Sequence, residues 1–300
     1  MDEQKNDEAE GVGRTETALD VASRSAAIGL DALLDHTMDP EPGSPATPLF
    51  PLDHWLRFAP STPMSKLGAD GHPRRDGLQA AADLPRRMWA GSSIDFHRPV
   101  FVGQVLERIT TTEAIVPKRG STGRLCFVTL RHEVSADGDL ALVERQTLVY
   151  REAEAARTAQ ASGPRPDSPA PEGWEWSRPL RVGEVALFRY SALTFNAHRI
   201  HYDLAYTTGV EGYPGLVVHG PLMATFLLDA FLRTHPRAAP LSFSFIARSP
   251  VFANELLHLC GRPAASGEPA RGKDTETQEL AIVGPEGRAM VTGHVAYRDA

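Results

Sequence analysis

Residues 99–106 of this 300-residue chain read PVFVGQVL, and residues 250–257 read PVFANELL. The two stretches start 151 positions apart (250 − 99), which is close to half of the chain length. Gly103 and Asn254 occupy the same place in each copy, and both residue types tolerate a positive φ. Each copy therefore predicts a tight turn that leads into a strand. A repeat at this spacing indicates a chain built from two similar halves.

Each half also contains an apolar stretch that predicts a long helix. In the first half, Thr17 is a suitable N-cap and apolar residues then recur at helical spacing, which predicts a helix near 19–37. In the second half, Pro221 precedes a run that is apolar on nearly every side, which predicts a buried helix over 221–234.

The other patterned segments of the first half predict strands, because they are rich in β-branched and aromatic residues and are separated by glycine-containing turns. They cover residues 92–96, 105–116, 125–134 and 141–150. These are the ingredients of a strongly curved antiparallel sheet wrapped round a helix, so the expected fold class is α+β. The expected organisation is a disordered acidic N-terminus (1–12), a first half (13–155), a linker rich in Ala, Pro and Ser (156–175) and a second half (176–300).

The composition limits the classes of partner. A hydrophobic content of 42% can form a large core, and a formal net charge of −7 argues against nucleic acid or an anionic membrane, because both require a basic surface. Cys126 and Cys260 show no metal-ligand spacing and are expected to be reduced core residues. The acidic residues 1–10 have no secretory or mitochondrial signal, and no apolar run is long enough to span a membrane, so we expect a cytoplasmic protein.

The segment from Pro60 to Arg75 is rich in Gly, Pro and Arg. We interpret it as an exposed basic loop, with binding of the phosphate groups of a ligand as the alternative role for its cationic residues. Those residues are Lys66, Arg74 and Arg75.

Residues 189–203 read RYSALTFNAHRIHYD, and His219-Gly220 follows shortly before the apolar helix. This density of His, Asn and Gly exceeds what a structural loop requires, so we expect the function to reside here. Gly220 lies at the helix N-terminus, where free N–H groups and the helix dipole favour an oxyanion such as the enolate of a thioester. The alternative for this junction is a structural helix cap satisfied by water.

The same stretch resembles the motif of the MaoC-like dehydratases and the (R)-specific enoyl-CoA hydratases, which have the hot-dog fold. His201 falls on the His of that motif, and His219-Gly220 falls on its downstream His-Gly pair. The positions that the motif gives to Asp, Asn and Pro are occupied here by Asn196, His198 and Arg199.

These departures are similar to the subgroup that contains the mesaconyl-CoA and itaconyl-CoA hydratases and the mitochondrial-type hydroxyacyl-thioester dehydratases. That subgroup also has an N-terminal segment, matched here by RRMWAG at 86–91 and FHRP at 96–99, so the resemblance extends over nearly the whole chain. It implies a double hot-dog fold in which the second half is catalytic and the first half is a non-catalytic wall of the site. We also expect a homodimer.

The resemblance implies a hydro-lyase that reversibly hydrates an enoyl-CoA to a 3-hydroxyacyl-CoA, with mesaconyl-CoA or itaconyl-CoA as the favoured substrate and a citramalyl-type CoA as the product. His201 would carry the proton, Asn196 would orient the water because an amide cannot titrate, and the N–H of Gly220 would polarise the thioester carbonyl. The residues expected to contact the substrate or hold its loops are Tyr190, His198, His219 and Arg199, the last through a free carboxylate.

Other chemistries agree less well with the sequence. His198-x-x-His201 resembles a metal pair, but zinc needs a third protein ligand and the helical His-Glu-x-x-His motif is absent. No Gly-x-Ser-x-Gly elbow or phosphate-binding glycine loop occurs, so we expect neither a metal nor a cofactor. The alternatives left open are a 3-hydroxyacyl-ACP or -CoA dehydratase of fatty acid metabolism, a hot-dog thioesterase and a non-enzymatic acyl-binding protein.

Overall fold

The computed structural model describes residues 11–36, 48–74, 84, 86–120, 123–152, 165–265 and 275–299. The predicted disordered N-terminus up to residue 10 and the linker residues 156–164 lie outside the described residues. The end of the predicted linker runs along the second half, where Arg165 pairs with Glu255 at 2.8 Å. No helix in the described ranges is long and apolar enough to cross a membrane.

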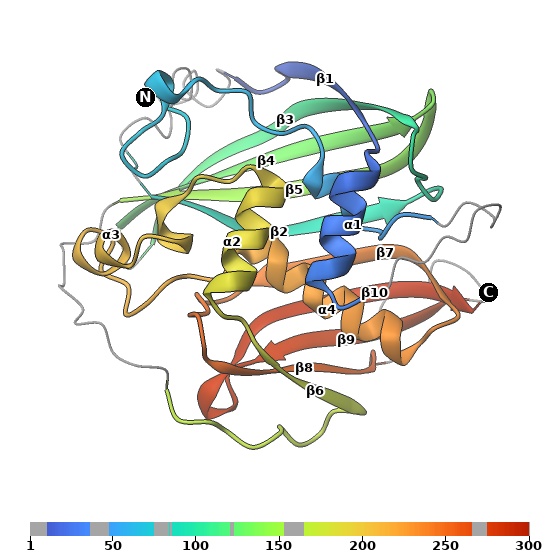
Figure 1. Cartoon of the computed structure of the whole chain (residues 1–300), viewed down its shortest axis with the longest axis vertical. Helices are drawn as coiled ribbons and strands as arrows, with labels where there is room; N and C mark the ends of the chain where they lie inside the picture. The colour runs from blue at the N-terminus through green and yellow to red at the C-terminus, as the bar shows by residue number, and fades with distance from the viewer. Residues whose placement is uncertain are drawn as a thin grey trace, which may run out of the picture.

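The described strands form one antiparallel sheet with the order β1-β3-β4-β5-β2-β7-β10-β9-β8-β6 (Figure 1). The first five strands of the chain form one side of this sheet and the last five form the other, as expected for two similar halves. The strands are β1 (Thr15–Val21), β2 (Arg86–Phe96), β3 (Val105–Gly120), β4 (Gly123–Ala136), β5 (Asp139–Arg151), β6 (Trp176–Arg181), β7 (Ala238–Ala247), β8 (Leu256–Pro263), β9 (Glu276–Val283) and β10 (Ala289–Asp299).

The two halves of the sheet join where β2 pairs with β7. Ser93 and Ser244, which are 151 positions apart (244 − 93), pair directly with each other, so equivalent strands meet at a local two-fold axis. The backbones approach closely at Gly91, where an added Cβ would lie 2.3 Å from the carbonyl oxygen of Phe245. Glycine is therefore required at this crossing point.

The sequence repeat occupies equivalent places in the two halves. Phe101 and Phe252 each form a single antiparallel bridge to a segment outside the named strands. Gly103 has a φ of +93° and Asn254 a φ of +67°. Their N–H groups donate, at 2.9 Å in both cases, to the carbonyl of the residue that directly follows β1 and β6 respectively. The prediction of a repeated tight turn is thus confirmed.

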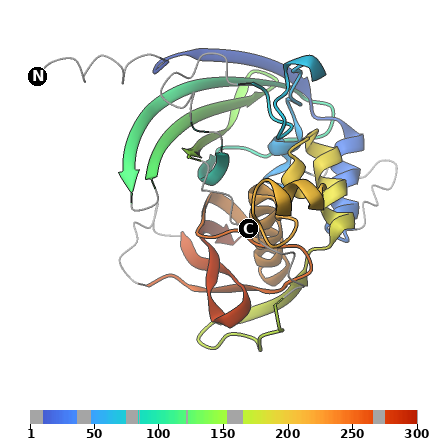
Figure 2. The ribbon, with the colours of Figure 1, turned by 90° about the vertical axis from the view of Figure 1, so that its left-hand side faces the viewer.

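Helices cover the concave face of the curved sheet (Figures 1 and 2). They are α1 (Arg24–Leu33), α2 (Glu184–Thr194), α3 (Leu204–Gly209) and α4 (Gly220–Thr234), with short 3₁₀ helices η1 (Asp53–Leu56), η2 (Met64–Lys66), η4 (Arg199–His201) and η5 (Pro285–Gly287). Helix α4 packs on β2, β7, β8, β9 and β10, and α1 packs on α2. Figure 1 shows α4 between the sheet and the α1–α2 pair.

Helix α4 forms the centre of the core, and it confirms the helix predicted over 221–234. Pro221 lies in its first turn, where the missing N–H is not needed, and apolar residues follow on all sides. Its fully buried side chains include those of Leu222, Leu227, Leu228 and Phe231. Each such side chain contributes about 1.5–3 kcal/mol through burial, so α4 fixes the two halves of the sheet around itself.

The first predicted helix, near 19–37, begins too early. Thr15–Val21 is instead strand β1, paired with β3, and the helix starts at Arg24. Leu19 and Val21 are 72% and 47% exposed, so their side chains are not part of a buried helical face. Moreover, α1 follows β1 as α2 follows β6, so α1 is the counterpart of α2. Within the described residues, the first half has no counterpart of α4.

A buried carboxylate fixes η1 to the sheet in the first half. Glu144 on β5 accepts hydrogen bonds from His54 Nε2 at 3.0 Å, Trp55 Nε1 at 3.0 Å and Ser92 Oγ at 2.6 Å. Burial alone raises the pKa of Glu144, but the bonds and charge of His54 and the Ser92 bond hold it below its ordinary value. Trp89 Nε1 also donates to Ser92 Oγ at 3.0 Å, so one carboxylate orders two tryptophans.

Replacing Gly103 by Ala tests the conformational role of the repeated turn. No atom lies within 4 Å of a Cβ added at Gly103, so the cost arises from its positive φ alone, and we expect a loss of about 1–2 kcal/mol in the free energy of unfolding. Gly209→Ala is the matched control, because its added Cβ also meets nothing and its φ is not positive. Urea unfolding of both variants measures the difference, and equal stabilities would contradict the account.

Candidate active site

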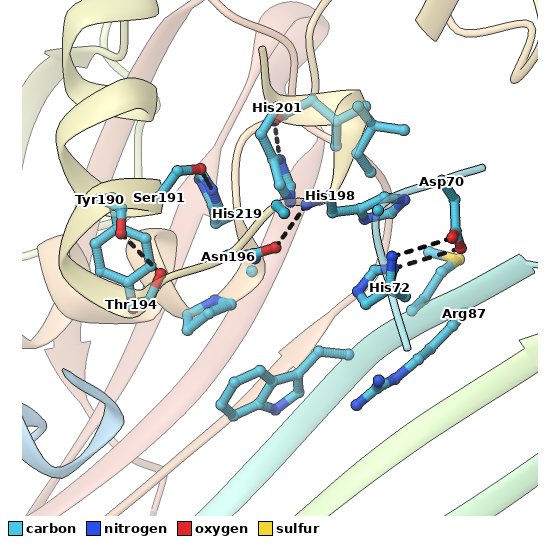
Figure 3. Close-up of a pocket in the computed structure, with 18 of the residues that line it drawn as sticks. Asp70, His72, Arg87, Tyr190, Ser191, Thr194, Asn196, His198, His201 and His219 are labelled. Carbon is cyan, nitrogen blue, oxygen red and sulfur yellow. Dashed lines mark hydrogen bonds and ion pairs between the residues drawn. The ribbon is translucent and has the colours of Figure 1, made fainter. Parts of the chain in front are cut away.

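A cavity of about 790 Å³ lies at the N-terminus of α4 and is bounded by β2, by the end of α2 and by residues 60–73. The predicted site residues that line it are Tyr190, Asn196, His198, His201, His219 and Gly220. The first half contributes Trp55, Trp89 and Leu148 to its apolar wall. The structure therefore brings six of the seven predicted residues to one cavity and leaves Arg199 outside it. Figure 3 shows Tyr190, Asn196, His198, His201 and His219 at this cavity.

Asn196 is positioned by the abrupt end of α2. Phe195 has a left-handed conformation with a φ of +50°, which turns the chain after the helix. The N–H of Asn196 then donates to the carbonyl of Ser191 at 2.8 Å, and its Oδ1 accepts from the N–H of His198 at 2.9 Å. Because Oδ1 already holds the backbone, the NH₂ group is the part of the amide best placed to bind a ligand.

His201 is held by η4 as a neutral base. Its Nδ1 lies 2.7 Å from the carbonyl oxygen of Val217, which accepts but cannot donate, so Nδ1 carries the proton and Nε2 has the lone pair. Its ring stacks on that of His219 with centroids 3.6 Å apart. Burial, followed by the nearby His198, lowers the pKa of His201 to about 3, so the ring is uncharged near neutral pH.

His219 is the N-cap residue of α4 and is 1% exposed. Its Nε2 lies 2.9 Å from Ser191 Oγ, and its ring meets the edge of Tyr190 at a centroid distance of 5.1 Å. Burial lowers the pKa of His219 well below its ordinary value. His219 therefore connects α2 to the start of α4 without adding a charge.

Gly220 begins α4 at the wall of the cavity. In the part of the chain that the structure describes, no backbone or side-chain acceptor is bonded to its N–H, and the next residue, Pro221, has no N–H. A Cβ at this position would touch the carbonyl oxygen of Trp89 at 3.5 Å. The helix N-terminus thus offers a donor and a partial positive charge at a narrow point of the site.

The loop predicted to be exposed and basic keeps Lys66 and Arg74 exposed, but residues 70–72 of the same loop are docked on the histidine motif. At Gly71, with a φ of +90°, an added Cβ would lie 1.9 Å from the carbonyl oxygen of Ala197, so a side chain is excluded there. The loop presents Asp70 and His72 to the cavity, and the rings of His72 and His198 are 4.2 Å apart. The sequence showed only a turn at this point, and nothing in its pattern indicated the docking partner. Arg75 lies outside the described residues.

Arg199 does not line the cavity, and other residues of the protein already engage its guanidinium, so the predicted contact with a substrate carboxylate finds no support in the structure. Its guanidinium pairs with Asp203 at 2.6 Å, lies 4.1 Å from the ring centroid of Tyr206 and donates to the carbonyl of Ala69 at 3.1 Å. Its backbone N–H donates to the carbonyl of Asp70 at 2.9 Å. Arg199 therefore holds the docked loop rather than a ligand.

Three residues at the mouth of this loop have the donor set of a cation site. One ligand atom from each of Asp70, His72 and His198 lies within 4.8 Å of the others. Asp70 is already engaged, because the hydrogen bonds and charge of His72 offset the effect of burial and lower the pKa of Asp70 to about 2. His201 is not part of this group, so the His198-x-x-His201 pair considered from the sequence is not the set that converges. The expectation that no metal is used stays a prediction.

The double hot-dog fold and the cavity at the N-terminus of its central helix agree with the class of thioester dehydratases, which the comparison with known families identifies. The family model of hydroxyacyl-thioester dehydratase type 2 matches residues 52–253. The chain belongs to this family.

Known relatives cover most of the chain. The mesaconyl-C(4)-CoA hydratase of Chloroflexus aurantiacus is 39% identical over 286 residues, which are 95% of each chain. The mitochondrial hydroxyacyl-thioester dehydratase type 2 of Schizosaccharomyces pombe is 30% identical over 242 residues, which cover 71% of this chain and 78% of that protein.

Solved structures share the fold. A MaoC-like dehydratase superposes with a TM-score of 0.68 at 15% identity and covers 97% of this chain and 99% of its own. A Mycobacterium tuberculosis protein described as a double hotdog fold superposes with a TM-score of 0.63 at 13% identity, covering 96% of both chains. The predicted double hot-dog fold is thus confirmed.

Burial of a neutral His201 predicts a pH dependence of stability. Its pKa is about 3 in the folded protein against 6.5 for a free side chain, so the unfolded chain binds more protons between these values. The free energy of unfolding should therefore fall as the pH is lowered through this range. In His201→Gln the fall should be shallower by up to about 1.4 kcal/mol per pH unit. Urea unfolding at several pH values measures both slopes, and identical slopes would show that His201 titrates normally.

Proposed function

We propose that the protein catalyses the reversible syn hydration of a branched dicarboxylic enoyl-CoA of the mesaconyl-C(4)-CoA type, giving a citramalyl-type CoA. The observation that carries this proposal is the convergence of three complementary groups on one cavity. They are the neutral ring of His201, the amide of Asn196 and the free N–H of Gly220. The relative that is 39% identical over 95% of both chains supports the substrate class.

In the proposed mechanism His201 carries the proton. Water loses a proton to Nε2 while its oxygen bonds to Cβ, and the electron pair of the double bond moves toward the thioester as an enolate. Nε2 then returns the proton to Cα on the same face, which regenerates neutral His201. The Val217 carbonyl fixes the tautomer that this cycle requires and stabilises the protonated ring through the same hydrogen bond.

The other two groups would stabilise the reacting atoms. The NH₂ group of Asn196 donates to the water oxygen and so directs its lone pair to Cβ, because the amide has no proton to exchange. The N–H of Gly220, aided by the dipole of α4, binds the thioester oxygen as negative charge develops on it. His198, His219 and Tyr190 would shape the cavity around these groups.

The low pKa of His201 suits a substrate that brings negative charge into the cavity. In the free protein, burial opposes protonation of the ring. A substrate carboxylate or a forming enolate beside the ring favours the imidazolium, so the base gains strength in the complex. A charged dicarboxylic acyl group therefore matches the cavity better than a long fatty acyl chain.

Incubation of the protein with a panel of enoyl-CoA thioesters tests the function. The panel comprises mesaconyl-C(4)-CoA, itaconyl-CoA, crotonyl-CoA and a long-chain 2-enoyl-CoA, and enoyl absorbance and free thiol are recorded separately. We expect loss of enoyl absorbance without thiol release, fastest with mesaconyl-C(4)-CoA. Thiol release without hydration would indicate a thioesterase, and no change with any thioester would favour an acyl-binding role.

Comparison of His201→Ala with Asn196→Ala tests the assignment of roles. A positioned acid/base group contributes roughly 10²–10⁴-fold to turnover, so His201→Ala should lose about that factor. Asn196→Ala should lose less, because it removes an orienting donor and not the proton carrier. Turnover is measured on the best substrate of the panel, with folding checked by thermal melting. If the folded Asn196 variant is the less active, His201 is not the sole proton carrier.

A further inference from the structure

The charged side chains that line the cavity are not all paired with an opposite charge. Among the described residues, four charged side chains face it, and three of them already have partners. Arg86 Nε pairs with Glu211 Oε2 at 3.4 Å and Arg86 Nη2 donates to the carbonyl of Glu211 at 2.8 Å, while Asp70 pairs with His72 at 3.5 Å. In the part of the chain that the structure describes, Arg87 has no carboxylate within ion-pair distance. Of the charged residues that the structure describes at the cavity, Arg87 is therefore the one cation without a counter-ion.

Arg87 reaches the histidine end of the cavity from the first half of the chain. It lies on β2, opposite Tyr150 in the register, and its side chain points into the cavity on the side of His72 and His198 (Figure 3). After burial and the charge of His72, the charge of Arg87 also contributes to the low pKa of His198. Its guanidinium is therefore close enough to act on groups at the catalytic motif.

Arg87 is half-buried, and a bound anion stabilises a partly desolvated guanidinium that has no counter-ion. Its planar fork fits a carboxylate through two parallel hydrogen bonds. In a mesaconyl-C(4) thioester the free carboxylate is bonded to Cβ, the carbon that receives the hydroxyl. A residue that binds this carboxylate must therefore reach the histidine end of the cavity, and Arg87 points into the cavity on the side of His72 and His198.

We infer that Arg87 is the specificity-determining residue of this site and binds the free carboxylate of a dicarboxylic acyl thioester. The inference rests on the proposed hydratase function and adds the group that selects its substrate. Arg199 and Arg86 are unsuitable for this role, because Asp203 and Glu211 respectively occupy their guanidinium groups. A carboxylate held by Arg87 also places negative charge at the histidine end of the cavity.

The test compares a charged and an uncharged substrate in Arg87→Met. We expect kcat/KM for mesaconyl-C(4)-CoA to fall about 10²-fold or more, since the carboxylate loses a charge-assisted, bidentate partner. For crotonyl-CoA, which has a methyl group and no carboxylate on Cβ, kcat/KM should change less than about threefold. Arg87→Lys keeps the charge but loses the fork, so its loss on mesaconyl-C(4)-CoA should be intermediate.

Arg237→Met is the control, because it removes a 75% exposed guanidinium that does not line the cavity. It should leave the preference between the two substrates unchanged. Equal losses on both substrates in Arg87→Met would overturn the inference and indicate a contact common to both, such as one with CoA. The proposed function fails separately, if the wild-type protein hydrates crotonyl-CoA but not mesaconyl-C(4)-CoA.

Binding of the free dicarboxylate provides a readout that does not depend on turnover. Mesaconate should raise the Tm of the wild-type protein and inhibit hydration of crotonyl-CoA, and both effects should be absent in Arg87→Met. The variant should itself melt no lower than the wild type, because it removes an unpaired, half-buried charge. Undiminished stabilisation of Arg87→Met by mesaconate would place the carboxylate elsewhere and contradict the inference.

Discussion

The burial of the N-terminus of α4 is the constraint on which the rest of the site depends. A helix that is apolar on nearly every side has to lie inside the protein, and α4 is largely buried from Leu222 to Phe231, while Gly220 and Pro221 at its start are partly exposed at the cavity. On the side of α2, His219 bonds to Ser191 and covers the start of α4. On the side of the first half, the loop around Gly71 packs against Ala197. What is left between them is a cavity with a free backbone donor at one end and uncharged imidazole rings along one side.

The two-half topology is largely predictable from the sequence, because an internal repeat shows which segments of the two halves are equivalent. The 151-residue spacing reappears as the direct pairing of Ser93 with Ser244. The predicted first helix starts too early, because the apolar residues Leu19 and Val21 of strand Thr15–Val21 directly precede the helical spacing of α1, although this strand has no buried residue. The sequence does not predict that α1 and α2 are equivalent helices. Both are short, and their equivalence follows from their positions directly after β1 and β6.

Local motifs predicted the part of the site that lies close together in sequence, namely the residues between Tyr190 and Gly220. Contacts across the halves were not predictable in this way. Asp70 and His72 belong to a loop that can dock because Gly71 has no side chain. The sequence contains several glycines in this loop, and it does not indicate which of them contacts another segment. The positive charge of Arg199 suggests a contact with a substrate carboxylate. In the structure its guanidinium instead forms an ion pair with Asp203, four residues along the chain.

The local two-fold axis between β2 and β7 relates Arg87 to Ala238 (238 − 87 = 151), so a cation and a methyl group occupy equivalent places. In a dimer of two identical subunits, every substitution appears in both subunits. A residue that is favourable at a position in one subunit therefore also occupies the equivalent position in the other subunit. When the two halves are joined in one chain, a substitution in one half no longer appears in the other half. Each half of the chain is free to diverge, so that one supplies the reactive motif and the other supplies the wall opposite it, while the axis still holds the two in a fixed relation.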